Sequence, residues 1–121
     1  MNVKSAAVCR FLLLTLGFIL PPHCGAEVVD YACGSVAMTD DGPYDYRVGH
    51  YRMKQVEGNH LSPDVVNLVK GQTGNIGADL DFVLRYFPNH HVALFAMFRL
   101  GEKEKRSKPL GANYVVECYF K

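Results

Sequence analysis

The sequence contains no tryptophan, almost no net charge and no apolar run long enough to cross a membrane. Its 121 residues include 13 Lys or Arg and 12 Asp or Glu, which gives a net charge of +1. A balance this close to zero creates no field that would attract nucleic acid or an anionic membrane surface. The longest apolar run, Phe11 to Leu20, is about half of the roughly 20 residues that a membrane-spanning helix needs. What remains is the composition of a globular chain, with room for one domain.

Motifs for cofactors and catalysis are also missing. The segment Gly71–Gly77 carries three glycines, but no Lys-Ser/Thr follows it and no apolar strand precedes it, so a nucleotide-binding loop is not indicated. A nucleophilic Cys118 with His90 or His91 as its base has no local motif to support it. We therefore expect no cofactor and no enzymatic activity.

Residues 1–26 have the organisation of a secretory signal peptide. Lys4 and Arg10 provide positive charge before and at the start of the apolar run, and Cys24–Ala26 provides small residues for cleavage after Ala26. Cleavage there predicts a periplasmic or secreted protein that has no stable membrane span. An uncleaved anchor is one alternative. A lipoprotein is another, although Pro21–His23 matches poorly the small residues that precede a lipidated cysteine.

Removal of this leader changes the cysteine count and the charge. The net charge becomes −1, and Cys33 and Cys118 remain near opposite ends of the mature chain. In an oxidising compartment these two cysteines can form a disulfide, which would be worth roughly 4 kcal/mol in the chain-entropy model. Two buried free thiols are the alternative, because cysteine is among the most buried residue types.

The predicted entry segment, residues 27–61, is irregular and rich in tyrosine. Thr39–Pro43 is a turn, because it combines Asp, Gly and Pro. The three tyrosines that follow could form a binding platform, or they could pack on a neighbouring element with their hydroxyls at the surface. The candidate partner-facing residues are Tyr44, Tyr46, Tyr51, His90 and His91.

Helical patterns begin at residue 62. Ser62–Asp64 combines an N-cap residue, a first-turn proline and a first-turn acid, and Gly71 follows Lys70. These residues predict a short helix from Pro63 to Lys70.

The clearest predicted helix carries one apolar stripe from Ile76 to Phe87, with apolar residues at i, i+4, i+7, i+8 and i+11. Asp79 and Asp81 lie in its first turns, where the helix dipole favours negative charge. They point about 200° apart and so cannot share one site. We expect both on the solvated face, with Asp81 and Arg85 forming a weak surface pair.

A further helix should follow Pro88, capped by Asn89. Val92–Phe98 is apolar on every side, which predicts burial all round between neighbouring helices. The segment Gly101–Lys108 is abruptly charged but lacks interleaved aromatic residues. It is therefore expected to be a solvated helix end and loop and not a nucleic-acid site.

The last segment, Tyr114–Phe120, allows two interpretations. It is rich in β-branched and aromatic residues, and by propensity alone it is a strand. As a helix it would place Val116 and Phe120 on one face as an i, i+4 pair.

Three blocks of the chain resemble the amino-terminal part of a family of exported bacterial tetratricopeptide-repeat proteins. The blocks are Gly42–Arg47, Gly77–His90 and Tyr114–Phe120. Within Leu80–Leu94, an apolar helix end, a proline, a short polar turn and an Ala-Leu pair follow one another, which is similar to the helix junction of a tetratricopeptide repeat. Asn113–Lys121 resembles the start of a repeat's second helix.

This resemblance implies an all-α fold, with antiparallel helix pairs in residues 62–121 and a helical state for residues 114–121. It also implies that the chain is cut inside a repeat. Val116 stands where such repeats usually have a small residue.

Together these features predict an exported, non-catalytic helical module that binds an unidentified protein or peptide. The alternative is a periplasmic metal-binding protein that uses His50, His60, His90 and His91. Zinc needs three or four converging ligands, and no His-x-x-x-His or His-x-His pair is present. The adjacent His90 and His91 project about 100° apart on a helix.

Overall fold

The computed structural model describes residues 32–37 and 40–121, and this part of the chain contains helices and no strand. The all-α prediction is therefore confirmed. The predicted signal peptide, residues 1–26, lies outside the described residues. The helices are η1 (Tyr46–Val48), α1 (Tyr51–His60), α2 (Pro63–Val66), α3 (Ile76–Tyr86), α4 (His91–Glu104) and η2 (Val116–Phe120), where η marks a 3₁₀-helix.

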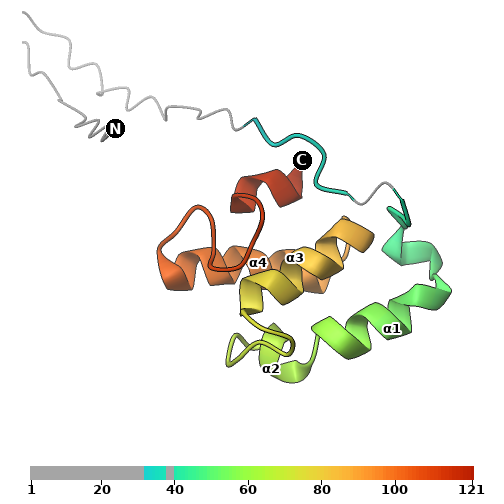
Figure 1. Ribbon diagram of the computed structural model, residues 1–121, viewed down its shortest axis with the longest axis horizontal. Coiled ribbons are helices and arrows are strands. Elements are labelled where there is room, and N and C mark those ends of the chain that lie inside the picture. The colour runs from blue at the N-terminus through green and yellow to red at the C-terminus, as the bar shows by residue number, and fades with distance from the viewer. Residues whose placement is uncertain (1–31, 38–39) are drawn as a thin grey trace, which may run out of the picture.

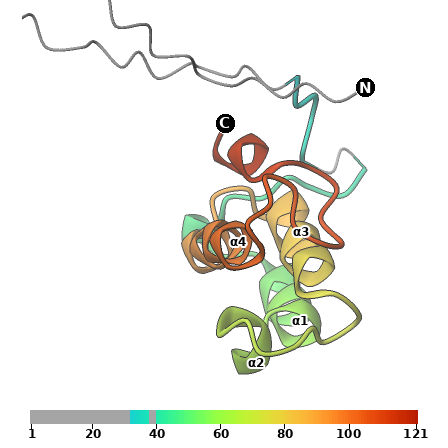
Figure 2. The same cartoon turned by 90° about the vertical axis from the view of Figure 1, so that its left-hand side faces the viewer.

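The helices are arranged around a central hairpin of α3 and α4 (Figure 1). Seen along α4, the helices α1 and α2 lie below this hairpin, and η2 lies above it (Figure 2). Helix α1 packs on α3, α2 packs on both α3 and α4, and η2 packs on α4.

Helix α3 supplies the centre of the core, as its apolar stripe predicts. Leu80, Val83, Leu84 and Phe87 are all buried. The helix ends at Tyr86, and Pro88 follows two residues later. Proline has no N–H for the helical ladder and disfavours helical backbone in the residue before it.

The described residues cover helix α4 on one face only, so the prediction that Val92–Phe98 is buried all round is wrong. Ala93 and Met97 are buried against the core, whereas Phe95 is 62% exposed and Phe98 is 48% exposed. The physical reason is the number of neighbours. Helices α2 and α3 and the short η2 pack on α4, and together they cannot cover its whole circumference.

Helix α2 ends at Val66, four residues before the predicted end at Lys70. The Val69 N–H donates to the Asp64 carbonyl oxygen (2.8 Å) and the Leu68 N–H donates to the Val65 carbonyl oxygen (3.0 Å). Leu68 has a left-handed φ of 58°, so these bonds form a Schellman motif that closes the helix. The turn places the Leu68 side chain in the core, where it is 3% exposed.

Helix α1 lies inside the segment 27–61, which was predicted to be irregular, so that prediction is wrong for Tyr51–His60. The helix is difficult to recognise because it is polar on almost every side, and Val56 is its one buried residue. The His50 ring supplies the N-cap, with Nδ1 accepting a hydrogen bond from the Arg52 N–H (3.3 Å).

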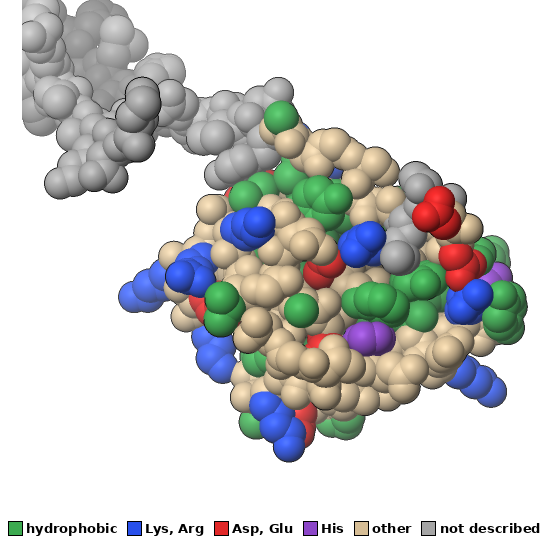
Figure 3. Space-filling view, viewed as in Figure 1, with side chains coloured by type: hydrophobic (Ala, Val, Ile, Leu, Met, Phe, Trp, Pro, Cys, Tyr) green, Lys and Arg blue, Asp and Glu red, His purple; other side chains and the backbone are tan. Residues whose placement is uncertain are grey.

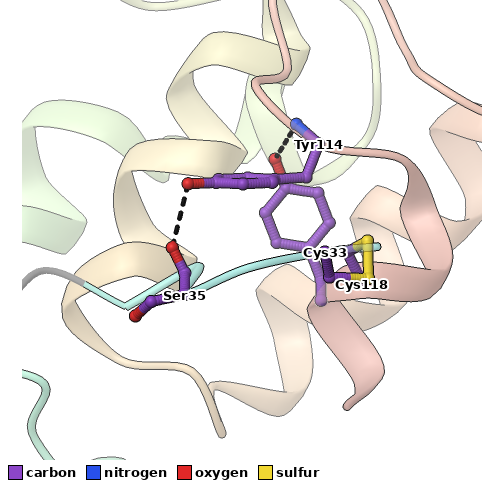
Figure 4. The surroundings of a disulfide bond; sticks show 5 residues. Cys33, Ser35, Tyr114 and Cys118 are labelled. Carbon is purple, nitrogen blue, oxygen red and sulfur yellow. Dashed lines mark hydrogen bonds between the residues drawn. A yellow bond between two sulfur atoms is a disulfide. The ribbon is translucent and has the colours of Figure 1, made fainter. Parts of the chain in front are cut away.

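The C-terminal segment is helical over Val116–Phe120 and is not a strand. It has 3₁₀ geometry and covers only part of residues 114–121, for which the resemblance implies a helix. Cys118 of η2 forms a disulfide with Cys33, 85 positions earlier, with a Cα–Cα distance of 5.4 Å (Figure 4). The structure therefore contains the disulfide and not two free thiols.

Candidate functional site

An open groove of about 800 Å³ runs between α4 and η2. Its apolar wall consists of Phe98 from α4 and of Val116 and Phe120 from η2. The rim carries two acidic and two basic residues, Glu102, Glu117, Lys105 and Arg106. In the charged helix end predicted for Gly101–Lys108, the Lys and Arg residues and Glu102 are exposed as expected, whereas Gly101 is buried. Part of this segment forms one side of the groove.

A second hollow, of about 490 Å³, continues from the first along α4. Both hollows are lined by Phe98 and Phe120, so they form one continuous surface. We call the exposed side chains of Phe95, Phe98 and Phe120, together with the partly buried Leu94, the phenylalanine face. Its three aromatic rings are 62%, 48% and 54% exposed in chain order. Single exposed apolar residues are common, but a cluster rimmed by polar groups is typical of an interaction site.

The floor of the groove depends on Gly101. A β-carbon on Gly101 would lie 2.8 Å from the Val116 Cγ2 atom, so α4 and η2 can approach this closely only without a side chain there. The Val116 N–H also donates to the Ser107 carbonyl oxygen (2.7 Å). Val116 therefore packs directly on α4.

Asp81 holds the C-terminal segment against α3. Its carboxylate accepts hydrogen bonds from the Tyr119 hydroxyl and from the Asn113 Nδ2 (2.7 Å). Burial, and to a smaller extent the hydrogen bond to Asp81, raises the pKa of Tyr119. The hydroxyl therefore stays protonated and donates. The predicted solvated position of Asp81 is wrong, because the residue is 3% exposed. The expected pair with Arg85 is present but long, at 3.9 Å.

Asp79 performs a similar role on the other side of α3, so its predicted exposure is also wrong. It is fully buried and accepts hydrogen bonds from the Gln72 N–H (2.6 Å), the Thr73 hydroxyl (2.5 Å) and the His60 Nδ1 (2.9 Å). Burial alone would raise the pKa of Asp79, but the bonds from Thr73, His60 and Gln72 outweigh it and lower the pKa. The ionised carboxylate on α3 therefore binds both the loop that follows α2 and the end of α1.

The predicted divergence of the two acids is confirmed, because Asp79 and Asp81 contact different segments of the chain. His60, but not Asp79, lines a small hollow of about 90 Å³ that Arg52 and Tyr86 also line. The Thr73 hydroxyl donates its hydrogen to Asp79, so it does not donate to His60, as a nucleophile that the histidine activates would. The Asp79–His60 pair therefore holds the loop after α2 in place.

His90 is buried and is not a partner-facing residue, so that prediction is wrong. Its Nδ1 accepts a hydrogen bond from the Ala93 N–H (3.3 Å) and caps α4, and its Nε2–H donates to the Glu57 carboxylate (3.0 Å). Burial lowers the pKa of His90 more than Glu57 raises it. Asn89, the expected cap, instead accepts a hydrogen bond from the Tyr46 N–H (2.9 Å).

Two of the three candidate tyrosines belong to the packing of the entry segment. The half-buried Tyr44 stacks on His50 with ring centroids 3.6 Å apart, and Tyr46 lies 4.0 Å from the His90 ring. Tyr51 is 75% exposed. His91 is exposed and lines the phenylalanine face at the start of α4.

The histidines are mostly engaged within the fold. His50, His60 and His90 each use a ring nitrogen in a hydrogen bond to another residue. Across residues 32–37 and 40–121, no group of three or more His, Cys, Asp or Glu side chains could hold a metal ion. Cys118 is in the disulfide, so it is not a thiolate beside His90 or His91.

The phenylalanine face was missed at the sequence level, although its signal is present. Val92–Phe98 has more apolar faces than a small helical domain can cover, and such an excess indicates a surface that contacts something else. Phe120 could not be added to it without knowing that η2 lies beside α4.

On the side shown in Figure 3, Lys and Arg side chains lie both at the edge and within the face, with Asp and Glu side chains among them. Within the described part of the chain, no helix combines the length and hydropathy that crossing a bilayer requires. No protein-family model, curated protein or solved structure matches this chain.

Proposed function

We propose that this chain is an exported, non-catalytic protein-interaction module that binds its partner in the groove between α4 and η2. The observation that carries the proposal is the phenylalanine face, which exposes Phe95, Phe98 and Phe120 together. Buried aromatic anchors contribute much of the binding energy in protein interfaces. Leaving three such rings in water has no advantage for an isolated domain.

The shape and charge of the groove favour a protein partner. It is open along its length, and its apolar wall is bordered by a charged rim, which resembles the organisation of protein interfaces. Its two acidic and two basic rim residues cancel, so a strongly charged ligand such as nucleic acid gains no attraction.

Export and repeat-like helix pairing are part of the same proposal. The apolar run and small residues of the leader support export, and the disulfide supports an oxidising compartment. The three sequence blocks that resemble exported tetratricopeptide-repeat proteins support a role in which paired helices present a binding surface.

The test places a photo-crosslinking amino acid at position 95 in cells that export the protein. We expect discrete protein adducts from position 95, which lies on the phenylalanine face. The matched control is position 69, because Val69 is 68% exposed but does not line the groove. Equal adducts from both positions, or none from either, would contradict the proposal. Phe98→Glu should remove the adducts from position 95.

A further inference from the structure

We propose that the partner on the phenylalanine face is a second copy of this chain, in a two-fold symmetric dimer. This inference rests on the proposed function, because it uses the same groove and names its occupant. It follows from the apolar faces of α4, from the shape of the surface beside them and from the charges on the rim.

The first observation is that α4 has an uncovered second apolar face. Its core face includes Ala93 and Met97, and its other face includes the exposed Phe95 and Phe98, with the partly buried Leu94 beside them. A helix that is apolar on all sides is normally buried on all sides, and within the described residues the fold buries only one. The second face is therefore suited to burial against another protein surface.

The second observation is that an exposed ring lies next to an open groove. Phe95 of α4 is 62% exposed, and the Arg99 guanidinium lies 5.7 Å from the centroid of its ring. The groove lies between Phe98 and the η2 residues Val116 and Phe120. A two-fold interface brings the same patch of both copies together, so the Phe95 ring of each copy can enter the groove of the other.

The third observation is the pattern of charge on the rim. The rim has two acidic residues, Glu102 and Glu117, and two basic residues, Lys105 and Arg106. A partner of strong single-sign charge would meet repulsion from half of these residues. Two copies related by a two-fold axis can instead place the acids of one opposite the bases of the other, which is electrostatically complementary.

The experiment measures self-association by sedimentation velocity. The protein is expressed with its own leader and purified after export, in the oxidised form. We expect a reversible dimer, and Phe95→Glu and Phe98→Glu should each raise its dissociation constant about tenfold or more. Val69→Glu is the matched control and should leave the dissociation constant unchanged. Circular dichroism checks that each variant keeps its helices.

Charge reversal gives an independent test that does not alter the apolar surface. Glu102→Lys with Glu117→Lys makes the rim basic, and Lys105→Glu with Arg106→Glu makes it acidic. Each double variant should self-associate more weakly than the original protein, and an equimolar mixture of the two should form a mixed dimer. Failure of the mixture to associate would overturn the two-fold arrangement.

The two proposals fail in different ways. A monomer at every concentration, with crosslinked adducts to a different protein from position 95, would overturn the dimer and leave the proposed interaction function intact. A monomer without adducts would overturn both. A dimer that neither Phe95→Glu nor Phe98→Glu weakens would place the interface elsewhere and overturn the inference.

Discussion

At the residue scale, three buried polar side chains connect the helices. Asp79 fastens the loop after α2, Asp81 holds the C-terminal segment and His90 caps α4. Burying such groups costs free energy unless they are hydrogen-bonded, and each of the three has at least two partners. The same bonds determine which helix ends lie together.

His90 should make the stability of the protein depend on pH. Its pKa in the folded protein lies below the ordinary value of 6.5 because the ring is buried. On acidification the unfolded chain binds the proton first, so the contribution is complete above pH 6.5 and decreases as the pH falls below it. Urea unfolding between about pH 7.5 and pH 5.5 should show this loss.

The control for this effect is His90→Asn, which keeps a side chain that can cap a helix but does not titrate. The free energy of unfolding of this variant should change less over the same pH range. The lowered pKa of Asp79 does not interfere, because the stability that Asp79 contributes is lost only as the pH falls below 3.8. Parallel pH profiles for His90→Asn and the original protein would contradict the role of His90.

The spacing of Asp79 and Asp81 on a helix predicted their divergence correctly and their exposure wrongly. For Asp79 a local signal was available, because two of its partners, Gln72 and Thr73, are only seven and six positions away. For Asp81 no local signal exists, because the Tyr119 hydroxyl is 38 positions away. Exposure depends on such distant partners, and spacing alone does not reveal them.

At the element scale, the close contact of α4 and η2 shapes the candidate site. Gly101 lies inside α4, where alanine would ordinarily stabilise the helix by roughly 0.5–1 kcal/mol. Here a β-carbon would meet the short, branched side chain of Val116 at 2.8 Å. The contact can be relieved only if α4 or η2 moves.

We therefore expect Gly101→Ala to lower the free energy of unfolding by about 1–3 kcal/mol, as overpacking does. Gly58→Ala in α1 is the matched control, because nothing lies within 4 Å of its added β-carbon, and it should be neutral or stabilising. Adding Val116→Ala to Gly101→Ala should recover part of the loss. Urea unfolding of the original protein, of Gly101→Ala, of Val116→Ala and of the double variant measures the coupling, and additive effects would contradict the contact.

Elements differ in how well local patterns predict them. Helix α3 is predicted well because its stripe from Ile76 to Phe87 has helical spacing and Pro88 ends it. Helix α1 is missed because it buries only Val56 and has no stripe. Helix α2 is overextended because its end depends on Leu68 turning into the core, which is a tertiary contact.

At the scale of the whole molecule, the disulfide joins the two ends of the described chain. Cys33 and Cys118 are 85 positions apart, and the segment before α1 also contacts the C-terminal segment where the Tyr114 hydroxyl donates to the Ser35 carbonyl oxygen (3.0 Å) (Figure 4). A bridge over a loop of this length restricts the unfolded chain strongly.

Replacing both cysteines with serine should therefore lower the free energy of unfolding by about 4 kcal/mol in the chain-entropy model. Urea unfolding of the oxidised protein and of the Cys33→Ser/Cys118→Ser variant measures the difference. A thiol assay on the unreduced, denatured protein should find neither of these thiols free. Two free thiols, or equal stability of the two proteins, would contradict this role.

The sequence by itself determined the helical class of the central region, the position of α3 and the break at Pro88. These follow from interactions between residues within a few positions of one another, which periodicity reports directly. The tertiary structure decided which polar residues are buried, that Cys33 pairs with Cys118, and that Phe95, Phe98 and Phe120 share one exposed surface. Those outcomes depend on segments that are far apart in the chain and meet only when α3, α4 and η2 pack together.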